Sequence, residues 1–271
     1  MTSPVRAIVR YSIIAIVIVV FFFPIYWMLI TSMKPQEEVL FYPPAFLPPE
    51  FTIRYYIESF GFRGGSALIN SLIVTSTVTL IATVFGAMGG YAFARYKIGG
   101  FHLPFWILST RMMPAVAAII PLFLVMQQLG LIDKYGAVIA VHLIITLPFA
   151  IWMMRGFFLE VPAELEEAAL IDGCSKWQLF SRIALPLTAP GLAVTALFCF
   201  IFSWNDFLFA LVLTRREATT LPVVISGLYS QHGVLWPVMT STAAMGLLPV
   251  FALALLAQRY LVRGMTLGAI K

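Results

Sequence analysis

Long runs without a single charged side chain limit what this chain can fold into. Five such runs cover residues 11–33, 64–94, 135–154, 183–205 and 218–258, and a sixth stretch, 102–128, is interrupted only by Arg111. A helix that crosses the hydrocarbon core of a bilayer needs about 20 predominantly apolar residues. We therefore expect an all-α polytopic membrane protein, a single domain over residues 1–271, with six transmembrane helices at about residues 8–32, 67–94, 103–128, 136–156, 188–213 and 239–261.

The composition agrees with this class of protein. Apolar residues make up 61% of the chain and charged residues 11%, whereas about 25% of the residues in a soluble domain are charged. The first apolar run is too long for the core of a secretory signal peptide and no small-residue cleavage site follows it, so we expect a retained anchor. Prolines between residues 35 and 49 predict an extended outer loop, followed by a short amphipathic helix at about residues 52–60.

Basic residues at the ends of the expected spans predict the orientation, because cytoplasmic loops carry an excess of Lys and Arg. With the N-terminus inside, ten basic residues fall on inner segments and six on outer ones. The inner set is Arg6, Arg10, Arg95, Lys97, Arg155, Lys176, Arg182, Arg259, Arg263 and Lys271, and the outer set is Lys34, Arg54, Arg63, Lys134, Arg215 and Arg216. We expect both termini in the cytoplasm, and we interpret the net charge of +5 as a topology signal rather than a nucleic-acid signal.

Polar residues gather in one cytoplasmic segment, residues 160–186, for which two short helices are expected. Eight charged residues fall between Arg155 and Arg182. Pro162 suits the first turn of a helix and Gly173 suits the left-handed residue that ends it. Ser175 and Gln178 have the spacing of a capping box that starts a second helix, and Pro186 would stop that helix. A polar, structured loop in so apolar a protein indicates a soluble partner.

The first of these helices carries small residues on one expected face. Leu165, Ala168, Ala169 and Asp172 recur at spacings of three and four, so they would share a face that lets another backbone approach. The acidic residues around them are expected to stay in water; these are Glu160, Glu164, Glu166 and Glu167.

Several kinds of chemistry have no counterpart in the sequence. No His, Cys, Asp and Glu group has metal-site spacing, no glycine-rich phosphate loop is present, and no nucleophile and base cluster together. We therefore expect no catalytic residue, no metal and no cofactor on this chain, which disfavours a membrane enzyme. The alternative is a stand-alone secondary carrier or channel for a small polar solute. A carrier coupled to ions needs ionisable residues inside the membrane, where only Arg111 comes close, and it has no use for segment 160–186.

Segment 160–186 resembles the EAA loop of bacterial ABC importer permeases. The shared pattern is Glu167-Ala168-Ala169, then Gly173, then Ile183-x-Leu185-Pro186. The C-terminal third is similar to carbohydrate-type permeases at residues 203–207, 221–223, 258–264 and 268–271. Over nearly its whole length the chain resembles the shorter, six-span permease subunit of maltose-type importers.

The resemblance implies a permease subunit that passes a sugar, polyol or acidic sugar derivative across the bacterial inner membrane by alternating access. The implied partners are a second homologous permease in a heterodimer, two ATPase subunits that bind ATP and Mg²⁺, and an extracytoplasmic solute-binding protein. The residues implied to couple the chain to an ATPase are Glu164, Glu167, Ala168, Ala169, Asp172 and Gly173.

The substrate path and the binding-protein contact are further expectations. Arg111, Trp204 and Asn205 are candidates for the path. Arg111 either binds a polar or acidic group of the solute, or has a structural role, in which it serves helix ends beside Pro114 or extends its charged group to the cytoplasmic face. We favour the structural role. In the resembled family the outer loop at residues 215–237 reaches the binding protein; a lid on the partner permease is an equal alternative. The candidate contact residues in this loop are Tyr229, Gln231, His232 and Gly233.

Overall fold

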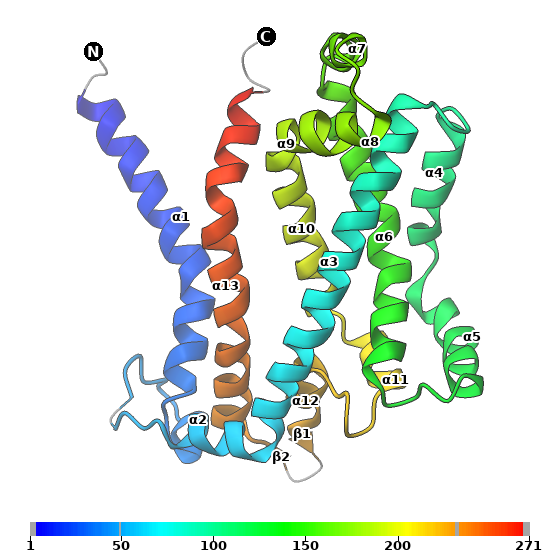
Figure 1. The fold of residues 1–271 in the computed structure, drawn as a ribbon. Helices are drawn as coiled ribbons and strands as arrows, with labels where there is room; N and C mark the ends of the chain where they lie inside the picture. Colours follow the sequence, from blue (N-terminus) through cyan, green and yellow to red (C-terminus); the bar gives the residue numbers. More distant parts are fainter. Residues whose placement is uncertain (1–3, 49, 231–232, 268–271) are drawn as a thin grey trace. The chain divides into compact units, whose positions relative to one another are not determined.

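The computed structural model describes residues 4–48, 50–230 and 233–267, which form helices and one short hairpin (Figure 1). The chain forms two compact units. The N-terminal unit comprises Met1–Ser66 with Val224–Leu248, and the main unit comprises Ala67–Val223 with Pro249–Lys271. Gln231, His232 and the terminal residues 268–271, to which some of the expectations above refer, lie outside the described residues.

The N-terminal unit contains one long apolar helix and the loop that follows it. Helix α1 (Pro4–Thr31) has only 6% of its apolar window buried, as expected of a helix surrounded by lipid. The loop holds a single 3₁₀ turn, η1 (Gln36–Glu38), before α2 (Arg54–Ser59) and the π-helical turn η2 (Phe60–Gly64). The short helix predicted from the sequence is therefore confirmed, whereas the loop before it contains turns and bends as well as extended residues.

The hairpin belongs to the same unit and was not expected from the sequence. Strands β1 (Tyr229–Ser230) and β2 (Gly233–Val234) pair antiparallel. Gln36 Nε2 donates a 2.9 Å hydrogen bond to the carbonyl of Val234, so the hairpin is tied to the start of the outer loop. Helices α12 (Leu221–Gly227) and α13 (Trp236–Leu267) flank it in the chain.

The main unit is built on close contacts between long helices. Glycines of α3 (Gly65–Arg95) bring it against α6 (Tyr135–Glu160). A Cβ added to Gly86 would lie 2.5 Å from the Cβ of Ala150, and one added to Gly90 would lie 2.7 Å from the backbone N of Arg155. Because lipid is as apolar as a Leu side chain, helices in a membrane associate through such close backbone approach. The spacing of four residues thus fixes where α3 crosses α6.

The helical content agrees with the expected fold class, and the spans differ in detail from those expected. Four helices of the described chain are long and apolar enough to cross a membrane, and the number rises to six if each of two bent pairs counts as one span. The unbroken helices α1, α3, α6 and α13 cover the first, second, fourth and sixth expected spans.

The third expected span is broken at Pro114. Helix α4 (His102–Ser109) and the 3₁₀ turn η3 (Thr110–Met112) precede the break, and α5 (Ala115–Gln128) follows it at 91°. Met113 is extended, with φ −66° and ψ 129°, because the ring of a following proline disfavours the helical conformation. Proline also lacks the N–H that a continuous helix would need.

The fifth expected span is also interrupted. Helix α10 (Ala189–Trp204) ends at Asn205, and a separate helix α11 (Leu208–Leu213) follows. Asn205 Nδ2 donates to the carbonyl of Ile201 at 2.9 Å, and the Asp206 carboxylate accepts from the backbone N–H of Ala210 at 3.2 Å. Short polar side chains compete with the backbone in this way and favour helix ends.

Asp133 connects the loop after α5 to the loop after α11. Its carboxylate accepts hydrogen bonds of 2.8–3.2 Å from the consecutive backbone N–H groups of Arg215, Arg216, Glu217 and Ala218. Partial burial acts to raise the pKa of Asp133, but these donors outweigh burial and hold the pKa below its ordinary value. The residue adopts a left-handed conformation, with φ 61°, which Asp and Asn tolerate better than most residues.

We predict that Asp133→Asn lowers the melting temperature of the purified protein in detergent by roughly 2–4 °C at neutral pH, because one charged acceptor becomes neutral. Asp133→Ala should lower the melting temperature further, since alanine has neither acceptor oxygen and adopts the left-handed φ less readily than Asp or Asn. Because the pKa of Asp133 is lower in the folded protein than in the unfolded chain, its ionised carboxylate stabilises the fold at pH values above the unfolded pKa of about 3.9. This stabilisation is lost as the pH falls through the folded pKa. The gap between wild type and Asp133→Asn should therefore narrow below about pH 4. Glu217→Gln, at an exposed neighbour, is the control and should leave the melting temperature unchanged.

Candidate functional site

Segment 160–186 forms the expected pair of short helices. Helix α7 (Ala163–Ile171) ends in a Schellman motif, in which Gly173 N–H donates to the Leu170 carbonyl and Cys174 N–H to the Ala169 carbonyl, both at 3.0 Å. Gly173 has φ +85°, so the predicted left-handed residue is confirmed. Pro162 is the residue just before α7 rather than part of its first turn.

The second short helix begins as the sequence predicts. Ser175 and Gln178 form both bonds of a capping box at the start of α8 (Lys176–Gln178). The helix continues through a π-helical turn, η4 (Leu179–Ala184), into α9 (Leu185–Leu187). It stops one residue after Pro186, and the pair formed with α10 is bent by 78°.

Glu166 fixes α7 to the rest of the main unit. Its carboxylate accepts from Arg95 Nε at 2.7 Å and from the Tyr91 hydroxyl at 2.8 Å. Arg95 also donates to the carbonyl of Val161, just before α7, at 3.0 Å. The expectation that Glu166 stays in water is wrong, because Glu166 is only 6% exposed. A buried carboxylate needs such partners, and here they join α7 to the end of α3.

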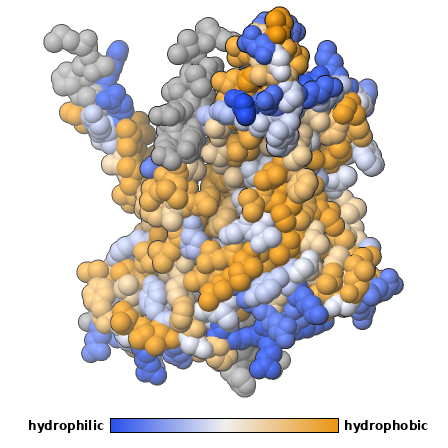
Figure 2. Space-filling model, in the orientation of Figure 1, coloured by the Kyte–Doolittle hydropathy of each residue, from blue (hydrophilic) through white to orange (hydrophobic). Residues whose placement is uncertain are grey.

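The expected face of α7 is divided between two sides of the helix. Ala169 is buried together with Glu166, three residues earlier, whereas Leu165 and Ala168 are exposed. Successive helical residues are about 100° apart, so Ala168 and Ala169 cannot both meet one partner surface. The exposed residues from the start of α7 to Gly173 are Ala163, Glu164, Leu165, Glu167, Ala168, Leu170, Ile171, Asp172 and Gly173. Figure 2 shows hydrophilic residues gathered around this end of the main unit, beside a hydrophobic band.

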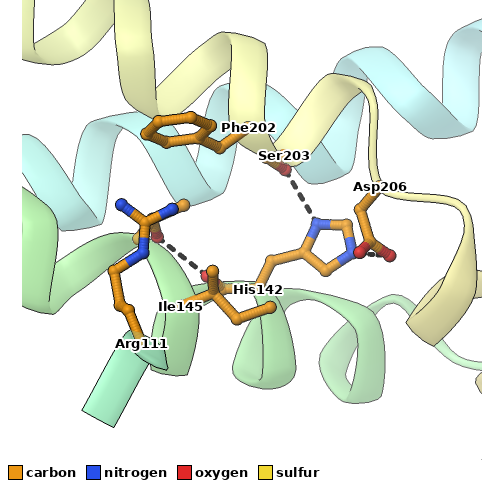
Figure 3. Close-up of a pocket in the computed structure, with 7 residues that line it drawn as sticks. Arg111, His142, Ile145, Phe202, Ser203 and Asp206 are labelled. Atoms are coloured by element: carbon orange, nitrogen blue, oxygen red, sulfur yellow. Dashed lines mark hydrogen bonds and ion pairs between the residues drawn. The ribbon is translucent and has the colours of Figure 1, made fainter. Parts of the chain in front are cut away.

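A cavity of about 150 Å³, lined by both polar and apolar side chains, lies where α4–η3, α6 and α10 meet. Its lining residues are Arg111, His142, Ile145, Thr146, Phe202, Ser203 and Asp206. Figure 3 shows the ring of Phe202 over the Arg111 guanidinium and the His142 ring between Ser203 and Asp206. The cavity belongs entirely to the main unit.

His142 organises one wall of the cavity. Its Nδ1 lies 2.8 Å from Ser203 Oγ and its Nε2 lies 3.1 Å from Asp206 Oδ1. Ser203 Oγ in turn lies 3.3 Å from Thr75 Oγ1 on α3. The sequence analysis did not indicate this network and did not single out His142 or Asp206. The available signal was one ionisable residue inside each of two apolar spans, which by itself marks a candidate site.

Arg111 forms the other wall, without an ionic partner. Its Cζ lies 4.4 Å from the centroid of the Phe202 ring and 5.2 Å from that of Phe149. Among the described residues no carboxylate pairs with Arg111 and no carbonyl accepts a hydrogen bond from it. The structural interpretation in which Arg111 serves neighbouring helix ends therefore finds no bond to support it.

The other candidate path residues are not part of this cavity. Asn205 is exposed and bonded to its own helix. Trp204 is buried and stacks on Phe200 with ring centroids 5.5 Å apart. In the outer loop, the described contact candidates are Tyr229, which is 73% exposed, and Gly233, with φ +111°.

Comparison with known proteins identifies the class. Residues 82–267 match the model of the family described as binding-protein-dependent transport system inner membrane component, and the chain belongs to this family. It is 38% identical over 254 residues to a probable ABC transporter permease protein, y4oR, of Sinorhizobium fredii, covering 93% of this chain and 91% of the relative. It is 36% identical over 255 residues to the trehalose transport system permease protein SugB of Mycobacterium tuberculosis, covering 92% of each.

A solved structure agrees. One chain of a bacterial ABC transporter involved in import of the acidic polysaccharide alginate superposes with a TM-score of 0.76 and 25% sequence identity, covering 96% of this chain and 99% of that one. The importer-permease prediction is thereby confirmed over the stand-alone carrier.

We predict that Glu166→Gln loosens α7, because it removes the ion pair with Arg95 and replaces one of the two accepting oxygens by an amide NH2, which cannot accept from Tyr91 or Arg95. Limited trypsin digestion should then cut after Lys176 or Arg182 about tenfold faster, the change expected for loss of roughly 1.4 kcal/mol of local stability. Glu164→Gln, at an exposed acid on the same helix, is the matched control. Equal cleavage rates in the two variants would show that the Glu166 contacts do not hold the segment.

Proposed function

We propose that this chain passes a sugar or sugar-like solute through the membrane and that segment 160–186 docks on an ATPase subunit, which supplies the energy. The observation that carries the docking role is the exposure of large apolar side chains on and at the end of α7, a helix that Glu166 fixes to the main unit. Ile171 is 88% exposed, Leu170 50% and Leu165 47%. Exposed apolar groups clustered on a polar surface are typical of a protein interface.

The anchoring of α7 supports transmission of movement. A docking helix that could tilt freely would dissipate the displacement of its partner. Here the Glu166 carboxylate ties α7 to α3 through Arg95 and Tyr91, and α3 is in turn held against α6 by glycine contacts. A displacement of α7 would therefore be transmitted through α3 to the helices that would cross the membrane.

The proposed assembly follows from this role. The chain has six spans, counting each bent pair as one, and both termini and segment 160–186 lie in the cytoplasm of a bacterium. A second homologous permease completes a heterodimer, two ATPase subunits bind ATP and Mg²⁺, and an extracytoplasmic binding protein delivers the solute. This chain binds no cofactor. The basic-residue distribution supports the orientation, and the family description supports the binding protein and the inner membrane.

The sugar class of solute rests on relatives. SugB is named for trehalose and the superposed importer for alginate. These are solutes of different size and charge, so the relatives support a carbohydrate without selecting one.

We predict that Gly173→Val abolishes solute-stimulated ATPase activity of the complete complex while the chain still inserts. Nothing lies within 4 Å of a Cβ added at Gly173, so the effect would come from the left-handed φ, which costs a β-branched residue roughly 1–2 kcal/mol. Gly173→Asn, which tolerates this conformation, is the control and should retain most stimulation. Glu167→Lys should also abolish stimulation by reversing a charge on the docking surface. Full transport by both Gly173→Val and Glu167→Lys would refute the docking role.

We predict that Tyr229→Ala weakens stimulation of the ATPase by the loaded binding protein several-fold and spares basal activity. The reason is the exposure of the Tyr229 ring at the hairpin, which makes it available as an aromatic anchor for a partner. Tyr229→Phe keeps the ring and should behave like wild type. Unchanged stimulation in Tyr229→Ala would instead favour the lid on the partner permease.

A further inference from the structure

We propose that the cavity between Arg111 and His142 binds an acidic group, a carboxylate or sulfonate, carried by the sugar-like solute. This inference rests on the proposed function, because it assumes that a sugar-like solute passes the cavity. It adds the charge of the solute and a residue that would recognise it.

The first step is the charge balance of the cavity. Arg111 is half-buried beside two aromatic rings and has no carboxylate partner among the described residues. A partly buried cation attracts an opposite charge more strongly than a fully exposed one does. The nearest carboxylate in the lining, Asp206, is engaged elsewhere, by His142 and by the N–H of Ala210. An anion entering the cavity could therefore pair with a guanidinium that has no ion pair among the described residues.

The second step is the geometry of the donors. The Phe202 ring covers a face of the guanidinium (Figure 3). Aromatic contact of this kind uses the face of the group and leaves its in-plane N–H donors available. Those donors form the planar fork that binds two oxygens of a carboxylate or sulfonate together. Lysine could not provide this fork.

The third step is the wall opposite Arg111. His142, Ser203 and Asp206 contribute an imidazole, a hydroxyl and a carboxylate that are already hydrogen-bonded to one another. Their remaining lone pairs suit sugar hydroxyls, which both donate and accept. The cavity thus has a cationic end and a hydroxyl-binding end, which matches an acidic sugar better than a neutral one.

The backbone beside Arg111 also suits a hydrated cavity. Non-helical backbone at membrane depth is tolerated where it is buried in protein or lines a water-filled space, and the break at Met113 and Pro114 directly follows the η3 turn that carries Arg111. A volume of about 150 Å³ corresponds to roughly five waters at ~30 Å³ each. It holds one substituted end of a solute rather than a whole oligosaccharide.

The test measures the electrostatic character of the cavity in the complete importer complex in detergent. Ile145→Cys, in a Cys174→Ser and Cys199→Ala background, places a reporter thiol in the lining. Its reaction rates with anionic 2-sulfonatoethyl and cationic 2-(trimethylammonio)ethyl methanethiosulfonate are read by peptide mass spectrometry. We expect the anionic reagent to be favoured, and Arg111→Gln to lower the anionic-to-cationic rate ratio about tenfold or more. Arg111→Lys keeps the charge and should keep most of the ratio.

Protection by solutes gives the second readout. Sodium glucuronate should slow labelling of the reporter thiol, glucose at the same concentration should not, and Arg111→Gln should remove the protection. If Arg111→Gln assembles poorly, protection by glucuronate and by glucose is compared in the protein that keeps Arg111 and in Arg111→Lys. This comparison tests the proposal without the Gln variant. Each of three results would overturn the proposal. These are an anionic-to-cationic rate ratio that is unchanged in Arg111→Gln, equal protection by glucuronate and glucose, and no labelling by either reagent.

Two further measurements distinguish a lipid headgroup from a solute and the cavity from the coupling role. In phosphatidylcholine nanodiscs, protection that appears only when phosphatidylglycerol is added would assign the cavity to a lipid headgroup and overturn the solute assignment. Binding-protein-stimulated ATPase activity of the same preparation tests the proposed function separately, since labelling needs no ATP. Stimulated ATPase with no charge preference would refute only the acidic-solute inference, and the converse result would refute only the coupling role.

Discussion

Lipid offers no hydrogen-bond partner to an exposed backbone amide or carbonyl, so a chain this apolar must satisfy its helix ends from within. Helix ends of the main unit are closed by hydrogen bonds from within the chain, including ends whose residues are exposed. The Asp133 carboxylate accepts hydrogen bonds from four consecutive backbone N–H groups after α11, and Asp206 accepts one from the N–H of Ala210. A Schellman motif ends α7 at Gly173. Each break in the helical structure is thus stabilised by a specific local arrangement, and the breaks in turn set where function can reside.

The long helices carry the complementary task of holding a fixed geometry. Gly86 and Gly90 bring α3 against α6 without a side chain between the backbones, and Glu166 joins α7 to the same end of α3. Docking surface, connecting helix and cavity are therefore linked by contacts inside one compact unit. His142 on α6 and Ser203 on α10 border the cavity, and Ser203 reaches Thr75 on α3. A displacement of α3 relative to these helices would change the walls of the cavity directly.

Sequence patterns predicted what depends on local chemistry and missed what depends on packing. The uncharged runs predicted the long helices, and Gly173, Ser175 and Gln178 predicted the helix ends of segment 160–186, because propensity and capping act within a few residues. The burial of Glu166 could not be foreseen, since its partners Tyr91 and Arg95 lie about 70 residues earlier in the chain. The cavity was only partly foreseen: Arg111 stood out as a lone cation, whereas His142 and Asp206 become informative only when the fold brings them together.

Two arginines of the main unit show how one side chain serves opposite purposes. Arg95 is paired with Glu166 and donates to a backbone carbonyl, and both contacts hold α7 in place. Arg111 contacts the rings of Phe149 and Phe202. Such contacts stabilise the positive charge weakly and accept none of the directional N–H hydrogen bonds of the guanidinium. A structural arginine would gain stability from a nearby carboxylate, yet Asp206, which lines the same cavity, is bound to His142 instead. Pairing Asp206 with His142 keeps Arg111 open, and this separation of the two charges gives the cavity its capacity to discriminate between an acidic and a neutral solute.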